Sequence, residues 1–359
     1  MMSEMDDFSL NFEQARILYS FLFFLIKEDI EREPDFQNRQ LKRRWLEIWI
    51  KSIEQFLQSL HDNQTEVTTA YLFTDYSELA KAVSKLKNNL TKKMPHYLIL
   101  LELSLFIIYY PLGVEEDDKF KKLTITDTYR QTIIKKLESF ADELGIETEY
   151  VRRFKSNDKK WNNEISEFNP LNLLLGGLIG GAVVAAVAAA IAIPILVPLL
   201  APVLAPGLSG AAAISAVLAA LGGGAIAAGG FGMAGGMVVI VGGGAILGTS
   251  VGTGIGSLFA QSPSLIIPQA AKFLVTFNDI LLEQKDVIKQ VIAMKARQII
   301  KQQRNTINEI VEQISELQMS VNQNEEQIKN LQKLVKFLRK TLEISQNLLK
   351  NFLQRHGLS

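Results

Sequence analysis

Three patterns of hydrophobic and polar residues follow one another along this chain of 359 residues. Up to about residue 165, apolar residues recur among charged ones at the i, i+3, i+4 spacing of amphipathic helices. Residues 168–271 then form a stretch of 104 positions without Asp, Glu, Lys, Arg or His. From residue 272 onward, apolar residues return at seven-residue intervals among Gln, Asn, Lys and Glu. The pattern predicts an all-α protein with three domains, which cover residues 1–165, 166–271 and 272–359.

Two apolar runs in the first domain are predicted to lie in the core, the first of them as a buried helix, rather than in a membrane. The run at residues 17–26 covers ten positions, whereas a spanning helix needs about 20. The run at residues 97–112 contains Glu102, a charge that a membrane helix would bury at a high cost. Between them, Trp45 and Trp49 share one face of an amphipathic helix. We therefore expect the first domain to be a water-soluble helical bundle.

An acidic loop follows the second apolar run. The segments LLELSLFIIYYPLGVEEDDKF and IIKKLESFADELGIETEYVRRF resemble the TerB-like helical domain over residues 95–155. In that family an apolar helix leads into an acidic loop and a later helix ends in a Leu-Gly turn, which correspond here to residues 115–118 and 144–154. The resemblance implies a function for the acidic loop, such as metal contact. The residues themselves favour a simpler interpretation, in which the carboxylates lie at a helix N-terminus beside unpaired N–H groups.

Five basic side chains precede the uncharged stretch. They are Arg152, Arg153, Lys155, Lys159 and Lys160, and Trp161 follows them. Lys and Arg on a cytoplasmic flank, with Trp at the level of the lipid headgroups, are typical of the entry to a membrane segment. The alternative is an ordinary solvated helix face.

The uncharged stretch is long enough to cross a bilayer. Residues 171–193 are nonpolar or small except for Asn172, and as a helix they would extend about 34 Å at ~1.5 Å per residue. Four prolines follow at every fourth position: Pro194, Pro198, Pro202 and Pro206. Because each proline removes a helical hydrogen bond, this part is predicted to be a kinked or re-entrant passage. Further helices are expected at about residues 210–221 and 229–258.

Glycines recur at every fourth position in this stretch and form GxxxG patterns, which let helices in lipid approach until their backbones touch. We expect helix packing or self-assembly through Gly176, Gly180, Gly232, Gly236, Gly244, Gly248, Gly252 and Gly256. A flexible linker, the alternative, would be polar. Over residues 170–260 the composition is similar to the glycine-rich hydrophobic domain of TMCO4-like membrane proteins. In that family an α/β-hydrolase domain follows, whereas here the following sequence has a helical pattern.

The C-terminal domain carries eight consecutive heptads. Their a positions are Ile300, Ile307, Ile314, Val321, Ile328, Val335, Leu342 and Leu349. The repeat is typical of a coiled coil, in which Gln303, Asn324 and Ser345 at d positions would fix the register as buried polar groups. We favour one continuous helix because the heptad phase is unbroken through the Asn-rich residues 322–324. The alternative is an intrachain hairpin that turns at those residues.

The remaining composition gives no sign of an enzyme, a cofactor or a nucleic-acid partner. The 38 basic and 38 acidic residues balance, and there is no cysteine for a disulfide or a thiolate metal site. A GxSxG string at residues 248–252 lacks the strand, acid and histidine that a nucleophile elbow requires. The first residues, MMSEMDDFSL, have no basic region followed by an apolar run, so we expect synthesis in the cytosol without a signal peptide.

The architecture, a hydrophobic middle flanked by long helices, also resembles the α-helical pore-forming toxins of the ClyA and haemolysin BL group. The sequence favours a nonenzymatic effector that inserts into a membrane, oligomerises through the glycines and the heptads, and permeabilises or remodels the bilayer. Its partners would be the lipid bilayer and further copies of the chain. Its location would be a membrane, with or without a soluble state before insertion. The alternative is a constitutive membrane scaffold whose helical and coiled-coil parts recruit partners.

Overall fold

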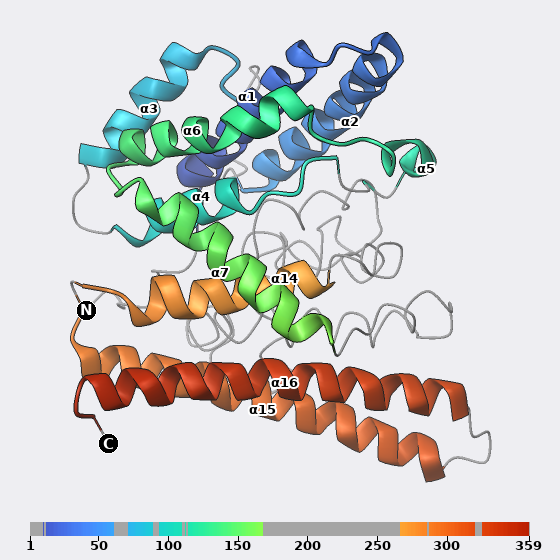
Figure 1. Ribbon diagram of the computed structural model, residues 1–359, viewed down its shortest axis with the longest axis vertical. Coiled ribbons are helices and arrows are strands. Elements are labelled where there is room, and N and C mark those ends of the chain that lie inside the picture. Colours follow the sequence, from blue (N-terminus) through green and yellow to red (C-terminus); the bar gives the residue numbers. More distant parts are fainter. Residues whose placement is uncertain are drawn as a thin grey trace. The chain divides into compact units, whose positions relative to one another are not determined.

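All regular structure that the computed structural model describes is helical (Figure 1), which confirms the predicted all-α class. The described residues are 10, 12–60, 71–88, 93–109, 112, 114–167, 266–285, 287–319 and 325–358. Within these ranges no helix combines the length and the hydropathy that a membrane crossing requires. The membrane helices predicted between residues 168 and 265 lie outside the described ranges. The described residues fall into two compact units, which divide between Lys155 and Ser156.

The first unit is a bundle around one apolar helix. It consists of α1 (Phe12–Arg32), α2 (Phe36–Leu60), α3 (Tyr76–Asn88), α4 (Met94–Ser104), α5 (Asp117–Phe120), α6 (Asp127–Leu144) and the first residues of α7 (Glu149–Ser166). Helix α1 contacts α2, α3, α4 and α6. Because these neighbours cover it, the apolar run at residues 17–26 is buried at nearly every position. The prediction of a core helix there is confirmed.

Aromatic side chains fill much of the core of the first unit. Trp45 and Trp49 of α2 are both 0% exposed, and their rings stack with centroids 6.2 Å apart. Phe21 of α1 packs on Phe140 of α6 with ring centroids 4.2 Å apart. Most apolar residues of α4 are buried, so the first part of the second apolar run belongs to the core as predicted. The helix ends at Ser104, and the irregular chain that follows includes Ile107, which is 38% exposed.

A buried charge network connects α1, α2 and the chain between α4 and α6. Asp29 accepts hydrogen bonds from Lys42 Nζ at 2.7 Å, from the Tyr109 hydroxyl at 2.5 Å, and from the backbone N and Oγ1 of Thr126 at 2.8 and 2.6 Å. Lys42 also pairs with Glu33 at 2.7 Å. Tyr109 adopts a left-handed φ of 64°, which is unfavourable for a bulky residue. Its bond to Asp29 therefore helps to hold the irregular chain in place.

The second unit combines both flanks of the uncharged stretch with the C-terminal helices. It contains α7 from residue 156 onward, α14 (Ile266–Val275), the π-helix η6 (Thr276–Leu282), α15 (Lys289–Met319) and α16 (Glu325–Arg355). The last residues of the predicted hydrophobic domain therefore belong to α14, where Ala270 and Ala271 are 0% exposed. Asn157 of α7 donates from Nδ2 to both carboxylate oxygens of Asp279 in η6, at 2.9 and 2.7 Å.

The C-terminal heptads form a hairpin instead of the single continuous helix that the sequence favoured. Helix α15 ends at Met319, α16 begins at Glu325, and the two pack side by side in antiparallel directions (Figure 1). An unbroken heptad phase defines the apolar seam of each helix but not the direction in which the next helix runs. The expectation of one long helix is therefore wrong, and the alternative hairpin describes the structure.

Charge along the two helices explains the reversal. Residues 305–319 contain three Glu and no Lys or Arg, whereas residues 329–340 contain five Lys or Arg and no acidic residue. In an antiparallel hairpin these two segments, one on each side of the turn, lie next to each other. The antiparallel arrangement therefore brings a negatively charged segment beside a positively charged one, as in coiled coils whose charges select the partner. Contacts of α14 and η6 with α16, and of η6 with α15, add apolar cover to the hairpin.

Candidate functional site: a basic groove on the helical hairpin

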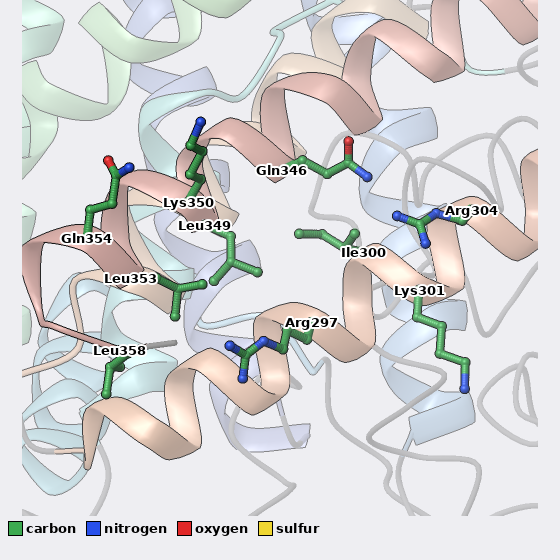
Figure 2. A pocket seen from close by; sticks show the side chains of 10 residues that line it. All are labelled: Arg297, Ile300, Lys301, Arg304, Gln346, Leu349, Lys350, Leu353, Gln354 and Leu358. Atoms are coloured by element: carbon green, nitrogen blue, oxygen red, sulfur yellow. The ribbon is translucent and has the colours of Figure 1, made fainter.

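A groove of about 510 Å³ runs between α15 and α16 at the end of the hairpin away from the turn (Figure 2). Its lining residues are Arg297, Ile300, Lys301 and Arg304 from α15, and Gln346, Leu349, Lys350, Leu353, Gln354 and Leu358 from α16 and the chain that follows it. Four of these side chains are cationic and none is acidic. Together these ten residues form the basic groove.

The floor of the basic groove is apolar. Ile300 and Leu349, both buried a positions, project toward each other from the two helices (Figure 2). Gly357, at a left-handed φ of 62°, ends α16 and lets the Leu358 N–H donate to the Leu353 carbonyl at 2.9 Å. This turn is a Schellman motif, in which the residue after the glycine packs back on the helix. Leu358 thereby extends the apolar floor beyond the last turn of α16.

The cations of the basic groove follow the helical repeat. Arg297, Lys301 and Arg304 are spaced i, i+4 and i+7 on α15, so they share one face over about 10 Å at ~1.5 Å per residue. Lys350 stands on α16 across the groove, and its ammonium group and that of Lys301 point away from the floor on opposite sides (Figure 2). Within the described part of the chain, Lys301, Arg304 and Lys350 form no ion pair with a carboxylate.

The positive charge at this end of the hairpin has no acidic counterpart on the neighbouring helix. Residues 289–304 hold five Lys or Arg and no acid, and residues 344–358 hold no acid either. Other cations near the groove have their own partners: Arg355 pairs with Glu283 at 3.3 Å, and Lys289 Nζ donates to the Gln284 carbonyl at 2.6 Å. Lys301, Arg304 and Lys350 are exposed and can thus be reached by an external anion, with apolar surface beside them.

Six of the eight predicted a positions are buried in the second unit: Ile300, Ile307, Ile314, Val335, Leu342 and Leu349. Ile328 is half-buried, and Val321 lies outside the described residues. Of the predicted polar d positions, Gln303 is 3% exposed and Ser345 is 0% exposed with its hydroxyl bonded to the Thr341 carbonyl at 3.0 Å. Asn324 lies outside the described residues. The seam of the hairpin therefore contains a polar layer.

The basic cluster before the uncharged stretch is spread around α7 and forms no common site. Arg152 pairs with Glu138 at 2.7 Å, the Arg153 guanidinium lies 5.4 Å from the centre of the Tyr150 ring, and the Lys160 ammonium lies 4.1 Å from that of Trp161. Lys155 is half-buried and Lys159 is exposed. Trp161, expected at the headgroup level, is 5% exposed and is a core residue of the second unit in this structure.

The acidic loop is the N-terminus of α5, as the simpler interpretation of residues 115–118 predicted. Asp117 accepts hydrogen bonds from the backbone N–H groups of Leu112 and Val114, at 2.8 and 3.2 Å. The hydrogen bond from Arg44 lowers the pKa of Glu116, and Lys121 lowers the pKa of Asp118 in the same way. These carboxylates are thus used within the fold. Among the described residues, no group of three or more His, Asp or Glu side chains could hold a metal ion.

The predicted glycine packing positions and the GxSxG string fall in residues 168–265, outside the described residues. Comparison of the chain with protein-family models, with curated proteins and with solved structures gives no match. The resemblances noted in the sequence therefore stay expectations. The basic groove itself was missed at the sequence level, although its signal was present: three cations at helical spacing in a segment without acidic residues.

Proposed function

We propose that this protein is an effector that inserts its uncharged stretch into a lipid bilayer and, after self-assembly, permeabilises or remodels it. The observation that carries the proposal is the absence of any ionisable side chain from residues 168–271. A protein surface of that length needs charged side chains to stay hydrated and monodisperse in water. A surface that faces lipid lacks charged side chains, because lipid offers them no partners. Lipid, or other copies of the chain, is therefore the medium that fits the stretch.

The described flanks support the same function. The second unit holds the end of α7 and the start of α14, between which the uncharged stretch lies. Besides the Asn157 to Asp279 hydrogen bonds, Glu164 of α7 forms an ion pair with Lys340 of α16 at 3.4 Å. Both ends of the stretch thus belong to one packed helical unit. The unit also carries the basic groove, which suits contact with an anionic surface.

The glycines give a direct test of permeabilisation. Leu at Gly244, Gly248 and Gly252 should hold neighbouring backbones apart and abolish dye release from vesicles, because the GxxxG track needs close approach. Membrane binding should survive, since the change removes no apolar area. A matched control replaces Val238, Val241 and the neighbouring Val239 with Leu, and should release dye like the unchanged protein.

A passive scaffold behaves differently in the same assay. It binds the bilayer before and after the glycine substitutions and releases no dye in either form. Dye release should be compared at matched membrane binding, over a range of pH and of lipid charge. An unchanged protein that releases no dye under any of these conditions would refute the effector function and favour the scaffold.

A further inference from the structure

We propose that the basic groove docks the protein onto the phosphate-bearing headgroups of an anionic lipid bilayer, an inference that rests on the membrane function proposed above. Cations near an anionic leaflet are attracted to it, and each contributes to binding until salt screens it. The groove offers Arg297, Lys301, Arg304 and Lys350 with no acidic side chain in its lining. Its charge is therefore complementary to such a surface.

The length of the cationic row favours a surface over a single small anion. Arg297 to Arg304 extend over about 10 Å of α15, and Lys350 lies on the facing helix. A free phosphate would be held by converging donors, whereas the ammonium groups of Lys301 and Lys350 point outward on opposite sides (Figure 2). A layer of headgroups presents several phosphates at once and can engage Lys301, Arg304 and Lys350 through different phosphates.

Apolar groups beside the cations point to lipid rather than to another polyanion. Leu353 and Leu358 are half-buried in the groove, and Met294 on the same helix as Arg297 is 56% exposed. Met294 lies three residues before Arg297 and seven before Lys301, so all three share one helix face. A helix face that combines basic and apolar side chains is typical of binding in the headgroup region of a membrane.

A nucleic acid is the competing polyanion, and the lining does not favour it. Proteins that bind single strands stack bases on aromatic side chains, but none of the described residues that line the groove is aromatic. The chain as a whole balances 38 basic against 38 acidic residues, without the basic excess expected of a nucleic-acid-binding protein.

The test is co-sedimentation of the full chain with vesicles of phosphatidylcholine, with and without phosphatidylserine. The groove variant carries Gln at Arg297, Lys301, Arg304 and Lys350. A matched control carries Gln at four exposed cations outside the hairpin, for which no ion pair is seen among the described residues: Lys51, Lys85, Lys122 and Lys135. We expect the groove variant to lose at least about tenfold in affinity for the anionic vesicles, and the control less than about threefold. Binding to pure phosphatidylcholine should not differ.

A milder variant guards against misfolding. Lys301→Glu with Lys350→Glu changes only two exposed side chains, and it should give the same loss with an unchanged helical circular dichroism spectrum. Equal losses in the groove variant and the control would mean general charge attraction and would overturn the proposal. A groove variant that binds anionic vesicles normally but fails to bind single-stranded RNA or inorganic pyrophosphate would also overturn the proposal.

The two proposals fail in different ways. Without dye release by the unchanged protein the effector function is refuted, yet groove-dependent binding to anionic vesicles can still be measured. Conversely, dye release that does not depend on lipid charge or on the groove cations would leave the effector function intact and refute the docking role of the groove.

Discussion

Replacing Asp29 with Asn tests whether the buried charge network holds the first unit together. Asn keeps the shape of the side chain and one carbonyl oxygen, which can still accept both hydrogen bonds from Thr126, now at 2.8 and 2.6 Å. Its amide nitrogen cannot accept the bonds that Asp29 receives from Lys42 at 2.7 Å and from Tyr109 at 2.5 Å. The substitution therefore removes two charge-assisted hydrogen bonds and leaves the packing almost unchanged.

The expected loss follows from these two bonds. A hydrogen bond to a charged group stabilises a fold by about 1.5–3 kcal/mol, which gives about 3–6 kcal/mol for the pair. Lys42 keeps its ion pair with Glu33 at 2.7 Å, so its charge is not left without a partner. This remaining pair favours the lower part of the range, and we expect the free energy of unfolding to fall by about 3–4 kcal/mol.

Tryptophan fluorescence during urea unfolding reports on this unit. Trp45 and Trp49 are 0% exposed, and Trp45 packs on Tyr109 with ring centroids 5.3 Å apart. A Trp161→Phe background removes the signal of the other unit. The control is Asp118→Asn, because this carboxylate is 89% exposed and solvent screens its pair with Lys121, so the substitution should leave the free energy of unfolding almost unchanged.

The network also predicts that the effects of substitutions at Asp29 and Lys42 on the free energy of unfolding are not additive. Adding Lys42→Met to Asp29→Asn removes the buried ammonium along with its partner, so the double variant should lose less stability than the sum of the two single variants. Additive losses, or a loss below about 1 kcal/mol for Asp29→Asn alone, would show that the network does not hold the unit together.

Three further outcomes are expected. Burial lowers the pKa of His96 below its usual 6.5, so as the pH falls the unfolded chain binds a proton at this histidine before the folded chain does. The free energy of unfolding of the first unit should therefore be highest above pH 6.5 and decrease below it, and the decrease should be smaller in His96→Gln. Gly145→Ala should cost the same unit about 1–2 kcal/mol in urea unfolding, because φ is 73° there. Spin labels on cysteines at Gln298 and Asn351 should lie close together, since one continuous helix would separate them by about 80 Å.

Burial in the core could be predicted from the sequence because it follows from local apolar patterns. The run at residues 17–26 and the heptads identified buried positions without knowledge of their partners. The Asp29 network could not be predicted in this way. Its partners lie 13, 80 and 97 residues away, and beside Lys27 and Glu28 the aspartate has the pattern of a solvated charge at a helix end.

The hairpin and its groove needed a pairing that the heptads do not specify. A heptad repeat gives the same apolar seam for one continuous helix and for two antiparallel helices. The acidic residues 305–319 and the basic residues 329–340 favour the hairpin, but this becomes clear only when the two arrangements are compared. The cations of the groove are ordinary exposed residues in the sequence of α15. Only the antiparallel partner helix, which adds Lys350 and no carboxylate, places them in a groove whose lining contains no acidic side chain.

The position of the two flanks limits how the uncharged stretch can cross a membrane. The end of α7 and the start of α14 both belong to the second unit, where Asn157 bonds to Asp279 and Trp161 is in the core. If the stretch inserts into a bilayer as proposed while that unit stays folded, both of its ends remain on one side, and we expect an even number of crossings. The chain has no native cysteine, so single cysteines at Lys159 and Gln298, both exposed, can be labelled separately. The cysteines are placed in the variant with Leu at Gly244, Gly248 and Gly252, which should bind vesicles without making them leak. A membrane-impermeant thiol reagent should then label both sites to the same extent, whereas protection of one site until detergent is added would require an odd number of crossings and an opened unit.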